Sequence, residues 1–475
     1  MRIRAILFRM IAVAAVTIVS ASPARADAPA ATVSGYVALD EGQIVKGISE
    51  QSGYSAIYKN VWQQRLLGAC NLDLSLGERM RAFLGIEGGL MSFSLRQYND
   101  VAASLLPLWD MYPTRAEANY SFGDTARPWL QLGFGLFPVK YNPDARNLGE
   151  YLLRSAAYPN FLTTDFEFPM TRLAGIRAGS TLWNSLHQDL FLTMETNYWP
   201  VGDLSLSYLV GYSIGRFADI GAGVSFQHLI SVWDSQEVNG QKRMYTTPKN
   251  NPDDMVIDAD GDTGYYTYRG TKLMGRVALD PKTFIPATIF GKNDLRVYAE
   301  IAVLGVKDYA SYVIVGDTVK DSLGIPITTP LGTDSIVNPR LAKGFSYYDS
   351  ILQRMPIMFG INIPTFKVLD VCALEFEWSG SRFPNSYRRA GDMDNQGLVP
   401  LPVRPAVGTA GATWEKWKWT LYLKRTFAKR FSISAQAARD HMKPATHHPG
   451  NRQDRGDFLI KKDHWWWMAR LRVNF

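Results

Sequence analysis

Every second residue is apolar through the last eleven positions of the chain, and this pattern restricts the possible folds more than any other feature. One face of the segment carries Trp465, Trp467, Ala469, Leu471, Val473 and Phe475, and the other carries Trp466, Met468, Arg470, Arg472 and Asn474. A period of two residues indicates a β-strand whose two faces meet different environments. The chain therefore ends on a predicted strand with one apolar and one mostly polar face.

The same alternation recurs along the whole chain in segments of about ten residues, the length that a tilted strand needs to cross a membrane. Fifteen segments show it: 66–76, 80–88, 115–122, 130–137, 173–178, 190–197, 204–213, 220–227, 272–280, 295–304, 354–363, 369–379, 416–427, 431–436 and 465–475. Such a series predicts an all-β, antiparallel transmembrane barrel.

The connections between these segments alternate between short and long. Tight turns are predicted at 77–78, 123–127, 183–189 and 427–430, and long loops near 92–112, 140–171, 231–269, 306–351, 380–413 and 442–463, with one short loop at 199–202. This asymmetry predicts hairpins whose tight turns lie at one end of the barrel and whose long loops lie at the other.

Residues 1–26 have the features of a cleavable secretory signal. Arg2, Arg4 and Arg9 precede an apolar stretch at 10–19, and small residues occupy positions 24 and 26. A single-span anchor is the alternative, but the stretch is shorter than the ~20 residues that a spanning helix needs. Residues 27–475 are then expected to form one barrel domain.

The signal delivers the N-terminus to the periplasm, and the last strand is expected to end there too. The number of strands must therefore be even. The missing strand is predicted at 33–40, where Val33, Val37 and Leu39 alternate with polar or small residues, and this leaves 41–61 as the first outer loop. The total is about sixteen strands, with fourteen and eighteen as alternatives. Sixteen strands enclose an aqueous lumen.

The formal charge of +7 falls to +3 without the four arginines of the signal segment. No compact basic patch accompanies it, so nucleic-acid binding is not expected.

The terminal strand, closing on Phe475, resembles the C-terminal assembly signal of bacterial outer-membrane barrels. The resemblance implies that Leu471, Val473 and Phe475 are recognised by the barrel-assembly machinery and that the barrel contacts outer-membrane lipid. The alternation of long and short connections further predicts that 231–269 and 306–351 lie outside the cell, with Gly77 and Glu78 in the periplasm.

The third outer loop, 140–171, follows the fifth strand and carries charges of both signs at Asp144, Arg146, Glu150 and Arg154, together with a short helical pattern. General bacterial porins are similar in having sixteen strands and an inward third loop that constricts the pore. The resemblance implies passive diffusion of small polar solutes or ions, no enzymatic activity, and association into a homotrimer. The alternative for this loop is packing on the rim of the barrel.

The alternation also sorts the strand charges between lipid and lumen. Thirteen basic side chains and eight acidic ones are predicted to face inward, and this excess of five predicts a mild preference for anions. The basic set includes a ladder on the fourteenth and sixteenth strands formed by Lys416, Lys418, Lys424, Arg470 and Arg472; the acidic set is Asp73, Glu87, Glu117, Glu195, Asp280, Glu300, Glu375 and Glu377.

Other motifs give weaker signals. Residues 211–215 match the Gly-x-Ser-x-Gly pattern of hydrolases, but they lie between two β segments and are expected to be a hairpin end. Asp258, Asp260 and Asp262 have a spacing that suits calcium, with a solvated loop as the alternative. Cys70 and Cys372 fall on the lipid-facing register and are expected to be unpaired, and His447 and His448 lack a predicted partner ligand.

The alternative to a channel is a closed outer-membrane barrel with a structural or adhesive surface role.

Overall fold

A computed structural model describes most of the predicted strands and the short turns between them. The described residues are 30–51, 54–93, 108–124, 128–153, 171–183, 185–194, 196, 202–230, 236–238, 241–243, 255–257, 263–265, 270–285, 288–306, 351–379, 416–439, 457–458 and 463–475. Within them the helices are two short 3-10 turns, η3 (Pro281–Phe284) and η4 (Ile351–Arg354). No described helix is long and apolar enough to cross a membrane.

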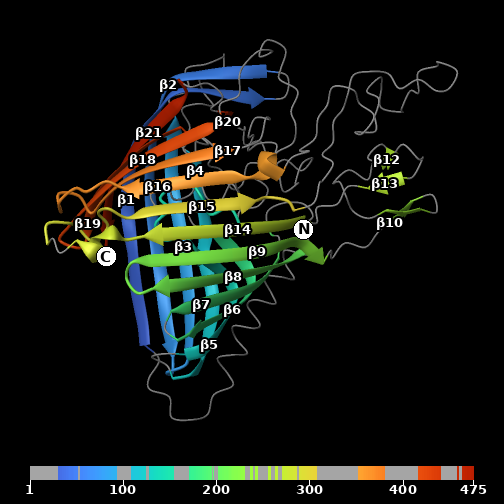
Figure 1. Cartoon of the computed structure of the whole chain (residues 1–475). Helices are drawn as coiled ribbons and strands as arrows, with labels where there is room; N and C mark the ends of the chain where they lie inside the picture. Colours follow the sequence, from blue (N-terminus) through green and yellow to red (C-terminus); the bar gives the residue numbers. More distant parts are fainter. Residues whose placement is uncertain are drawn as a thin grey trace.

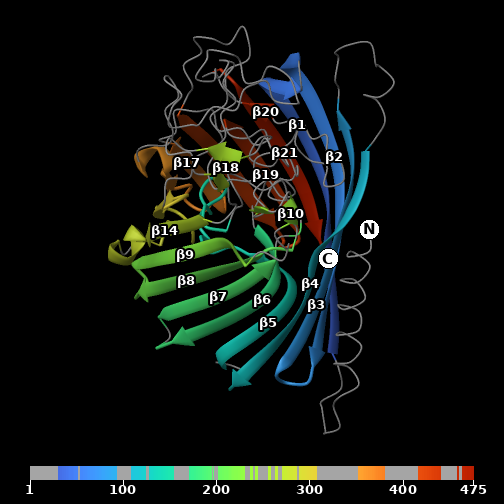
Figure 2. The same cartoon turned by 90° about the vertical axis from the view of Figure 1, so that its right-hand side faces the viewer.

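Sixteen antiparallel strands form a closed barrel (Figures 1 and 2). Each strand pairs with the next wall strand in the sequence, and the last one pairs with the first over Tyr36↔Asn474 to Lys46↔Trp465. The strands are β1 (Ala30–Gln51), β2 (Tyr54–Leu76), β3 (Met80–Phe93), β4 (Leu108–Gly123), β5 (Pro128–Val139), β6 (Thr171–Leu182), β7 (Leu186–Met194), β8 (Leu204–Ile214), β9 (Ala218–Ile230), β14 (Gly270–Leu279), β15 (Val297–Val303), β16 (Pro356–Asn362), β17 (Val371–Ser379), β18 (Trp417–Phe427), β19 (Phe431–Arg439) and β21 (Trp465–Asn474).

Three further short pairings lie outside these sixteen strands. The two-residue strand β20 (Asp457–Phe458) pairs with β1 beyond the end of β21. Two small hairpins, β10 (Gln236–Val238) with β11 (Gln241–Arg243) and β12 (Met255–Ile257) with β13 (Thr263–Tyr265), occur in the long connection between β9 and β14.

The alternation of side chains agrees with the predicted register. On β1, Val33, Val37 and Leu39 are about half exposed on the outer face, whereas Tyr36 and Asp40 are buried on the inner face. On β21, Trp466, Met468 and Arg470 are buried inside, and the apolar residues between them face outward. An apolar outer face and a polar inner face are the two surfaces that a transmembrane barrel requires, so the predicted fold class is confirmed.

The strand pairing confirms the strand count, and most connections follow the predicted asymmetry of the two ends. At one end, adjacent described strands are joined by short connections such as 77–79, 215–217 and 428–430, with the longer 280–296 as an exception; at the other end most intervals between strands are long, with 52–53 as an exception. The strand predicted at 33–40 is present.

The first outer loop, predicted at 41–61, is wrong. The hairpin of β1 and β2 continues through these residues, from Glu41↔Gln64 to Gln51↔Tyr54. A strand needs apolar alternation only where one face meets an apolar phase, whereas the backbone ladder can continue into water without it. The polar composition of 41–61 therefore marked the end of the apolar band and not the end of the strands.

Two local predictions are also confirmed. The Gly-x-Ser-x-Gly segment is the end of the β8–β9 hairpin, where Ser213 donates a hydrogen bond to Asp219 at 2.9 Å and Gly215 has a positive φ of 56° in the turn. Cys70 and Cys372 are both free, and each lies on the outward register of its strand.

Candidate functional site: a loop inside the barrel

Residues 140–153, which we call the lumen loop, enter the barrel directly after β5. The side chains of Leu148 and Leu152 are completely buried, and Tyr151 is nearly so. They belong to one apolar cluster with side chains from the walls of six strands: Phe137, Phe191, Leu209, Met274, Tyr298 and Met358. The lumen loop therefore fills part of the interior against the β5–β16 side of the wall.

The helical pattern predicted in this loop is wrong. Residues 141–153 form turns and bends, and Gly149 and Glu150 have positive φ angles of 82° and 63°. A Cβ added to Gly149 would lie 2.7 Å from Met358 Cε, so the backbone approaches the wall closely there. The loop's N–H groups bond to side-chain carboxyls instead of to helical carbonyls.

Glu375, which projects inward from β17, accepts hydrogen bonds from one limb of the lumen loop. The backbone N–H groups of Asn147 and Leu148 donate to its Oε2 at 2.9 and 3.0 Å. The N–H of Arg146 and the hydroxyl of Tyr298 donate to Oε1 at 2.5 and 2.7 Å. Four donors thus converge on one carboxyl group that is fully buried.

Glu300 on β15 holds the second limb in the same way. The N–H groups of Glu150 and Tyr151 donate to its two oxygens at 3.0 and 2.9 Å. The Tyr141 hydroxyl and the Asn142 amide donate to the same carboxyl at 2.6 and 3.0 Å. Burial, reinforced by the carboxyls of Glu300 and Glu150, raises the pKa of Tyr141 well above its ordinary value, so its hydroxyl stays protonated and able to donate.

Glu377, which also projects inward from β17, is the third carboxyl that holds the loop. It accepts a hydrogen bond from the hydroxyl of Tyr151 at 2.7 Å and from Lys418 Nζ on β18 at 2.6 Å. Hydrogen bonds to charged acceptors are about twice as strong as neutral ones. The three glutamates, Glu300, Glu375 and Glu377, therefore fix the position of the lumen loop, and we call them the anchor glutamates.

The four charged residues predicted at the constriction have different surroundings. Asp144 is buried and forms an ion pair at 2.8 Å with Arg296 at the entry to β15. Glu150 is buried within the loop itself and accepts the N–H groups of Tyr141 and Asn142. Arg146 is partly exposed, and Arg154 lies outside the described residues.

The residues of the predicted basic ladder all occupy inward positions on β18 and β21 or at the start of β18. Lys418 pairs with Glu377, Arg470 is buried against Asp40, and Lys416 is exposed. Lys424 is partly buried, and Arg472 lies over the ring of Tyr36 with its guanidinium carbon 3.8 Å from the ring centroid.

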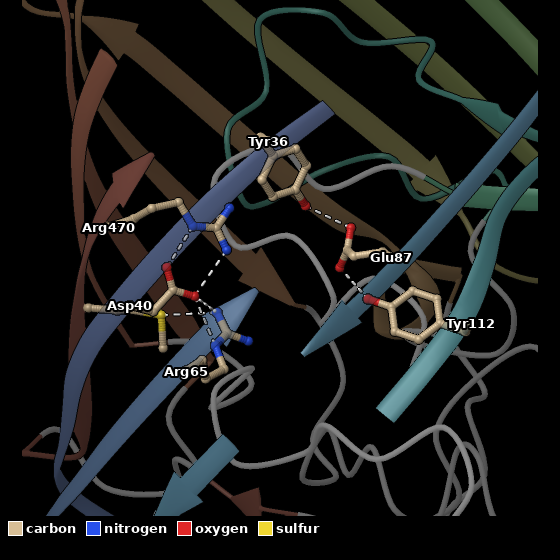
Figure 3. Close-up of polar contacts among 7 residues, drawn as sticks. Tyr36, Asp40, Arg65, Glu87, Tyr112 and Arg470 are labelled. Atoms are coloured by element: carbon tan, nitrogen blue, oxygen red, sulfur yellow. Dashed lines mark hydrogen bonds and ion pairs between the residues drawn. The ribbon is translucent and has the colours of Figure 1, made fainter. Parts of the chain in front are cut away.

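A buried triad joins the first two strands to the last (Figure 3). Asp40 accepts hydrogen bonds from Arg65 Nε at 2.9 Å and from Arg470 Nε at 2.7 Å, and all three side chains are about 1% exposed. Asp40 is directly opposite Arg65 on β2 and Arg470 on β21. The triad therefore links the strands on both sides of the seam where the barrel closes.

Figure 3 also shows a second polar group on the same wall, in which Glu87 accepts hydrogen bonds from the hydroxyls of Tyr36, at 2.8 Å, and Tyr112. The three residues come from β1, β3 and β4, and the small Ala69 of β2 lies in register between Tyr36 and Glu87.

Among the residues with described side chains, the sorting of inward charges missed three acidic residues that form ion pairs with inward arginines. Asp40, Asp189 and Asp219 each pair with inward arginines, namely Arg65 and Arg470, Arg177, and Arg276. Adding these three acids reduces the predicted excess of five positive charges to two. Cross-strand register would have found them, because Asp40 lies opposite its arginines and Asp189 lies two positions from Phe191, the direct neighbour of Arg177.

The terminal residues of the predicted assembly signal lie on the outer face. Leu471, Val473 and Phe475 are exposed there. The backbone of Phe475 exchanges two hydrogen bonds with Gly35 of β1, at 3.0 and 3.1 Å. The last residue thus takes part in closing the barrel.

The predicted calcium ligands Asp258, Asp260 and Asp262 lie outside the described residues, as do His447 and His448. Among the residues that are described, no group of three or more His, Cys, Asp or Glu side chains could hold a metal ion.

No protein-family profile and no curated protein matches the chain. Among solved structures, it is similar to a mutant of the Rh. blastica porin (TM-score 0.39, 7% identity, 94% of this chain and 100% of that one). It is also similar to Salmonella typhi OmpF in complex with daunomycin (0.44, 10%, 94% and 97%) and to Pseudomonas putida OprB at low pH (0.39, 8%, 93% and 91%). The fold described above stands on the strand pairing of this chain itself.

Proposed function

We propose that this protein is an outer-membrane channel for the passive diffusion of small polar solutes and ions. The observation that carries the proposal is the inward lumen loop inside a closed ring of sixteen strands. A ring of this size leaves an aqueous interior, and a loop anchored against one side narrows that interior without needing to move. The charged residues Asp144 and Arg146 belong to this constriction.

The proposed channel has a mild preference for anions, because basic side chains are the more exposed members of several inward ion pairs. A buried acid contributes its charge to the wall, whereas the exposed base meets the solute. In three of these pairs the basic side chain is the more exposed: 34% against 6% in Arg115–Glu117, 29% against 7% in Arg296–Asp144, and 13% against 1% in Lys418–Glu377. In Arg276–Asp219 the acid is the more exposed, at 29% against 12%.

Salt gradients across planar bilayers test this selectivity. We expect a reversal potential that favours chloride over potassium at low salt and that shrinks as added salt shortens the Debye length to ~3 Å at 1 M. Replacing Lys416 and Lys418 with glutamate together should weaken the preference. A cation preference in the unmodified protein would contradict it.

Trimer formation and recognition of Leu471, Val473 and Phe475 by the barrel-assembly machinery are part of the same proposal. Both derive from the resemblance to outer-membrane barrels. Mild electrophoresis of detergent extracts tests the first of them, and only a heat-modifiable monomer under every extraction condition would exclude the trimer.

A further inference from the structure

The connection 280–296, between β14 and β15, is the longest at the end of the barrel that carries the C-terminus (Figure 1). It packs against the next connection at this end, 363–370, and the ring centroids of Phe290 and Phe366 lie 5.8 Å apart. The buried carboxyl of Asp294 joins the two, because it accepts hydrogen bonds from the N–H of Gly291 at 2.7 Å and from the N–H of Phe366 at 3.1 Å. We call residues 281–285, 288–296 and 363–370 the rim platform.

The rim platform exposes large apolar side chains. Four of them are more than half exposed: Phe284, Ile289, Phe366 and Val368. Ile363 continues the outward row of Phe359 on β16, so the platform adjoins the apolar outer wall of the barrel. An exposed apolar surface of this kind marks a place where a protein meets another molecule or a membrane.

Two residues of the platform have a backbone conformation that favours glycine and asparagine. Phe366 and Lys367 have positive φ angles of 53° and 69°. Residues with bulky side chains adopt this conformation at a cost in conformational energy. Such a local cost points to a role for the side chains themselves, which here are an aromatic ring and an ammonium group held at the surface.

A charged residue lies on the lipid-facing side of the neighbouring strand β18. Arg425 has an outward register there, between Leu423 and Phe427. Its Nη1 donates to the carbonyl oxygen of Lys367 at 2.5 Å, and its guanidinium carbon lies 5.8 Å from the ring centroid of Phe427. A basic side chain on the lipid face is unfavourable at the middle of a bilayer and nearly neutral at its surface. Arg425 therefore indicates that the platform lies at the depth of the lipid headgroups.

The acidic side chains of the same surface already have partners. Asp294 is buried, and Asp280 Oδ1 lies 3.0 Å from Lys282 Nζ. Asp370 Oδ2 accepts the N–H of Thr426 at 2.6 Å, and its Oδ1 is 3.7 Å from Arg425, in a long ion pair that is about one third exposed. A guanidinium group carries five N–H donors, so these contacts leave donors of Arg425 for a further anion.

We propose that the rim platform, together with Arg425, binds the phosphate groups of anionic phospholipids. The exposed rings and aliphatic side chains suit the boundary between headgroups and acyl chains, where aromatic residues of membrane proteins concentrate. Three accessible basic side chains complement the lipid charge: Lys292, Lys367 and Arg425. The planar fork of an arginine also matches two oxygens of one phosphate. The inference requires a barrel that spans a membrane, and it does not depend on conduction through the lumen.

The test measures the lipid that the purified full-length barrel retains in native mass spectrometry, after equilibration with equal amounts of phosphatidylglycerol and phosphatidylcholine. Both lipids carry a phosphate, but only phosphatidylglycerol has a net charge. Three basic side chains near an anionic headgroup predict a preference for phosphatidylglycerol of at least about tenfold. In the triple variant Lys292→Gln, Lys367→Gln and Arg425→Gln, most of this preference should be lost.

Two control variants separate charge from position. The charge-conserving variant Lys292→Arg, Lys367→Arg and Arg425→Lys should keep the preference. Arg79→Gln removes an exposed basic residue from the turn 77–79, which lies outside the platform, and it should also keep the preference. Heat-modifiable migration on electrophoresis reports that each variant is folded.

Equal retention of the two lipids by the wild type would overturn the proposal, and so would an unchanged preference in the folded glutamine variant. Displacement of the lipid by inorganic phosphate would indicate a site for the free ion and would overturn it too. If the glutamine variant does not fold, the wild type decides: a preference that fades as salt shortens the Debye length to ~3 Å supports the basic surface, and a preference that salt leaves unchanged overturns it. A barrel that prefers phosphatidylglycerol but carries no current would contradict the channel function alone.

Discussion

Removing one charge from the anchor glutamates should release one limb of the lumen loop. In Glu375→Gln, the amide keeps one acceptor oxygen and places an NH₂ group against two of the four donors that Glu375 now accepts. Each hydrogen bond to a charged group is worth roughly 1.5–3 kcal/mol, so losing two costs about 3 kcal/mol or more. Since 1.4 kcal/mol is a factor of ten, the ratio of docked to undocked loop should fall at least about 100-fold.

Glu300→Gln acts on the other limb, at Glu150 and Tyr151, and the double variant should undock the loop more completely. We expect larger and noisier single-channel currents and a higher size limit for neutral polymers in liposome-swelling assays. Asp189→Asn is the matched control, because Asp189 faces inward in an ion pair with Arg177. None of the lumen-loop contacts described above involves Asp189. Heat-modifiable migration on electrophoresis reports that each variant is folded. Unchanged conductance and size limit in a folded double variant would refute the anchoring role.

Three further predictions concern the barrel itself. Asp40→Asn leaves two buried arginines without their charge partner and should destabilise the barrel by roughly 3–5 kcal/mol in denaturant unfolding. Asp189→Asn, in a more exposed ion pair, should cost less than about 1 kcal/mol. Equal losses of stability would contradict a special role for the seam triad. In a cysteine-free background, a membrane-impermeant thiol reagent on intact cells should label Asn250→Cys and not Glu78→Cys, and the opposite pattern would invert the topology. Deletion of Phe475 should lower the yield of assembled barrel, because it removes the backbone contacts with Gly35 as well as the terminal aromatic residue; a normal yield would exclude both contributions.

The wall of the barrel could be predicted from the sequence because the apolar phase acts on every second residue. Each strand that crosses it, such as β21 with Leu471 and Val473 outside and Arg470 inside, must repeat the same pattern. Where that constraint ends, the prediction fails. The ends of β1 and β2, from Glu41 to Val61, continue the same ladder, although their composition predicts a loop.

The anchorage of the lumen loop could not be predicted for a different reason. The contacts of Glu375 with Asn147 and Leu148 join residues more than 220 positions apart. They also involve backbone N–H groups, which every residue except proline carries, so no residue type marks the partner. The alternation predicts that Glu300, Glu375 and Glu377 face the lumen. It does not predict that their carboxyls accept hydrogen bonds from the lumen loop.

The charge balance of the lumen failed at the edges of the alternating segments. Asp189 and Asp219 stand immediately before the predicted segments 190–197 and 220–227, and the structure includes both in strands. Pairing with Arg177 and Arg276 follows from those strands. The revised excess of two positive charges makes the exposure of each side chain, more than the sum, the basis of the expected selectivity.

The most direct test of the central claim is the current through single barrels reconstituted from purified full-length protein in planar bilayers. An open lumen beside the anchored loop predicts stepwise current increments that rise linearly with voltage and with salt concentration. A folded, heat-modifiable barrel that inserts into the bilayer and produces no such steps would show that the lumen is closed, and it would contradict the channel function.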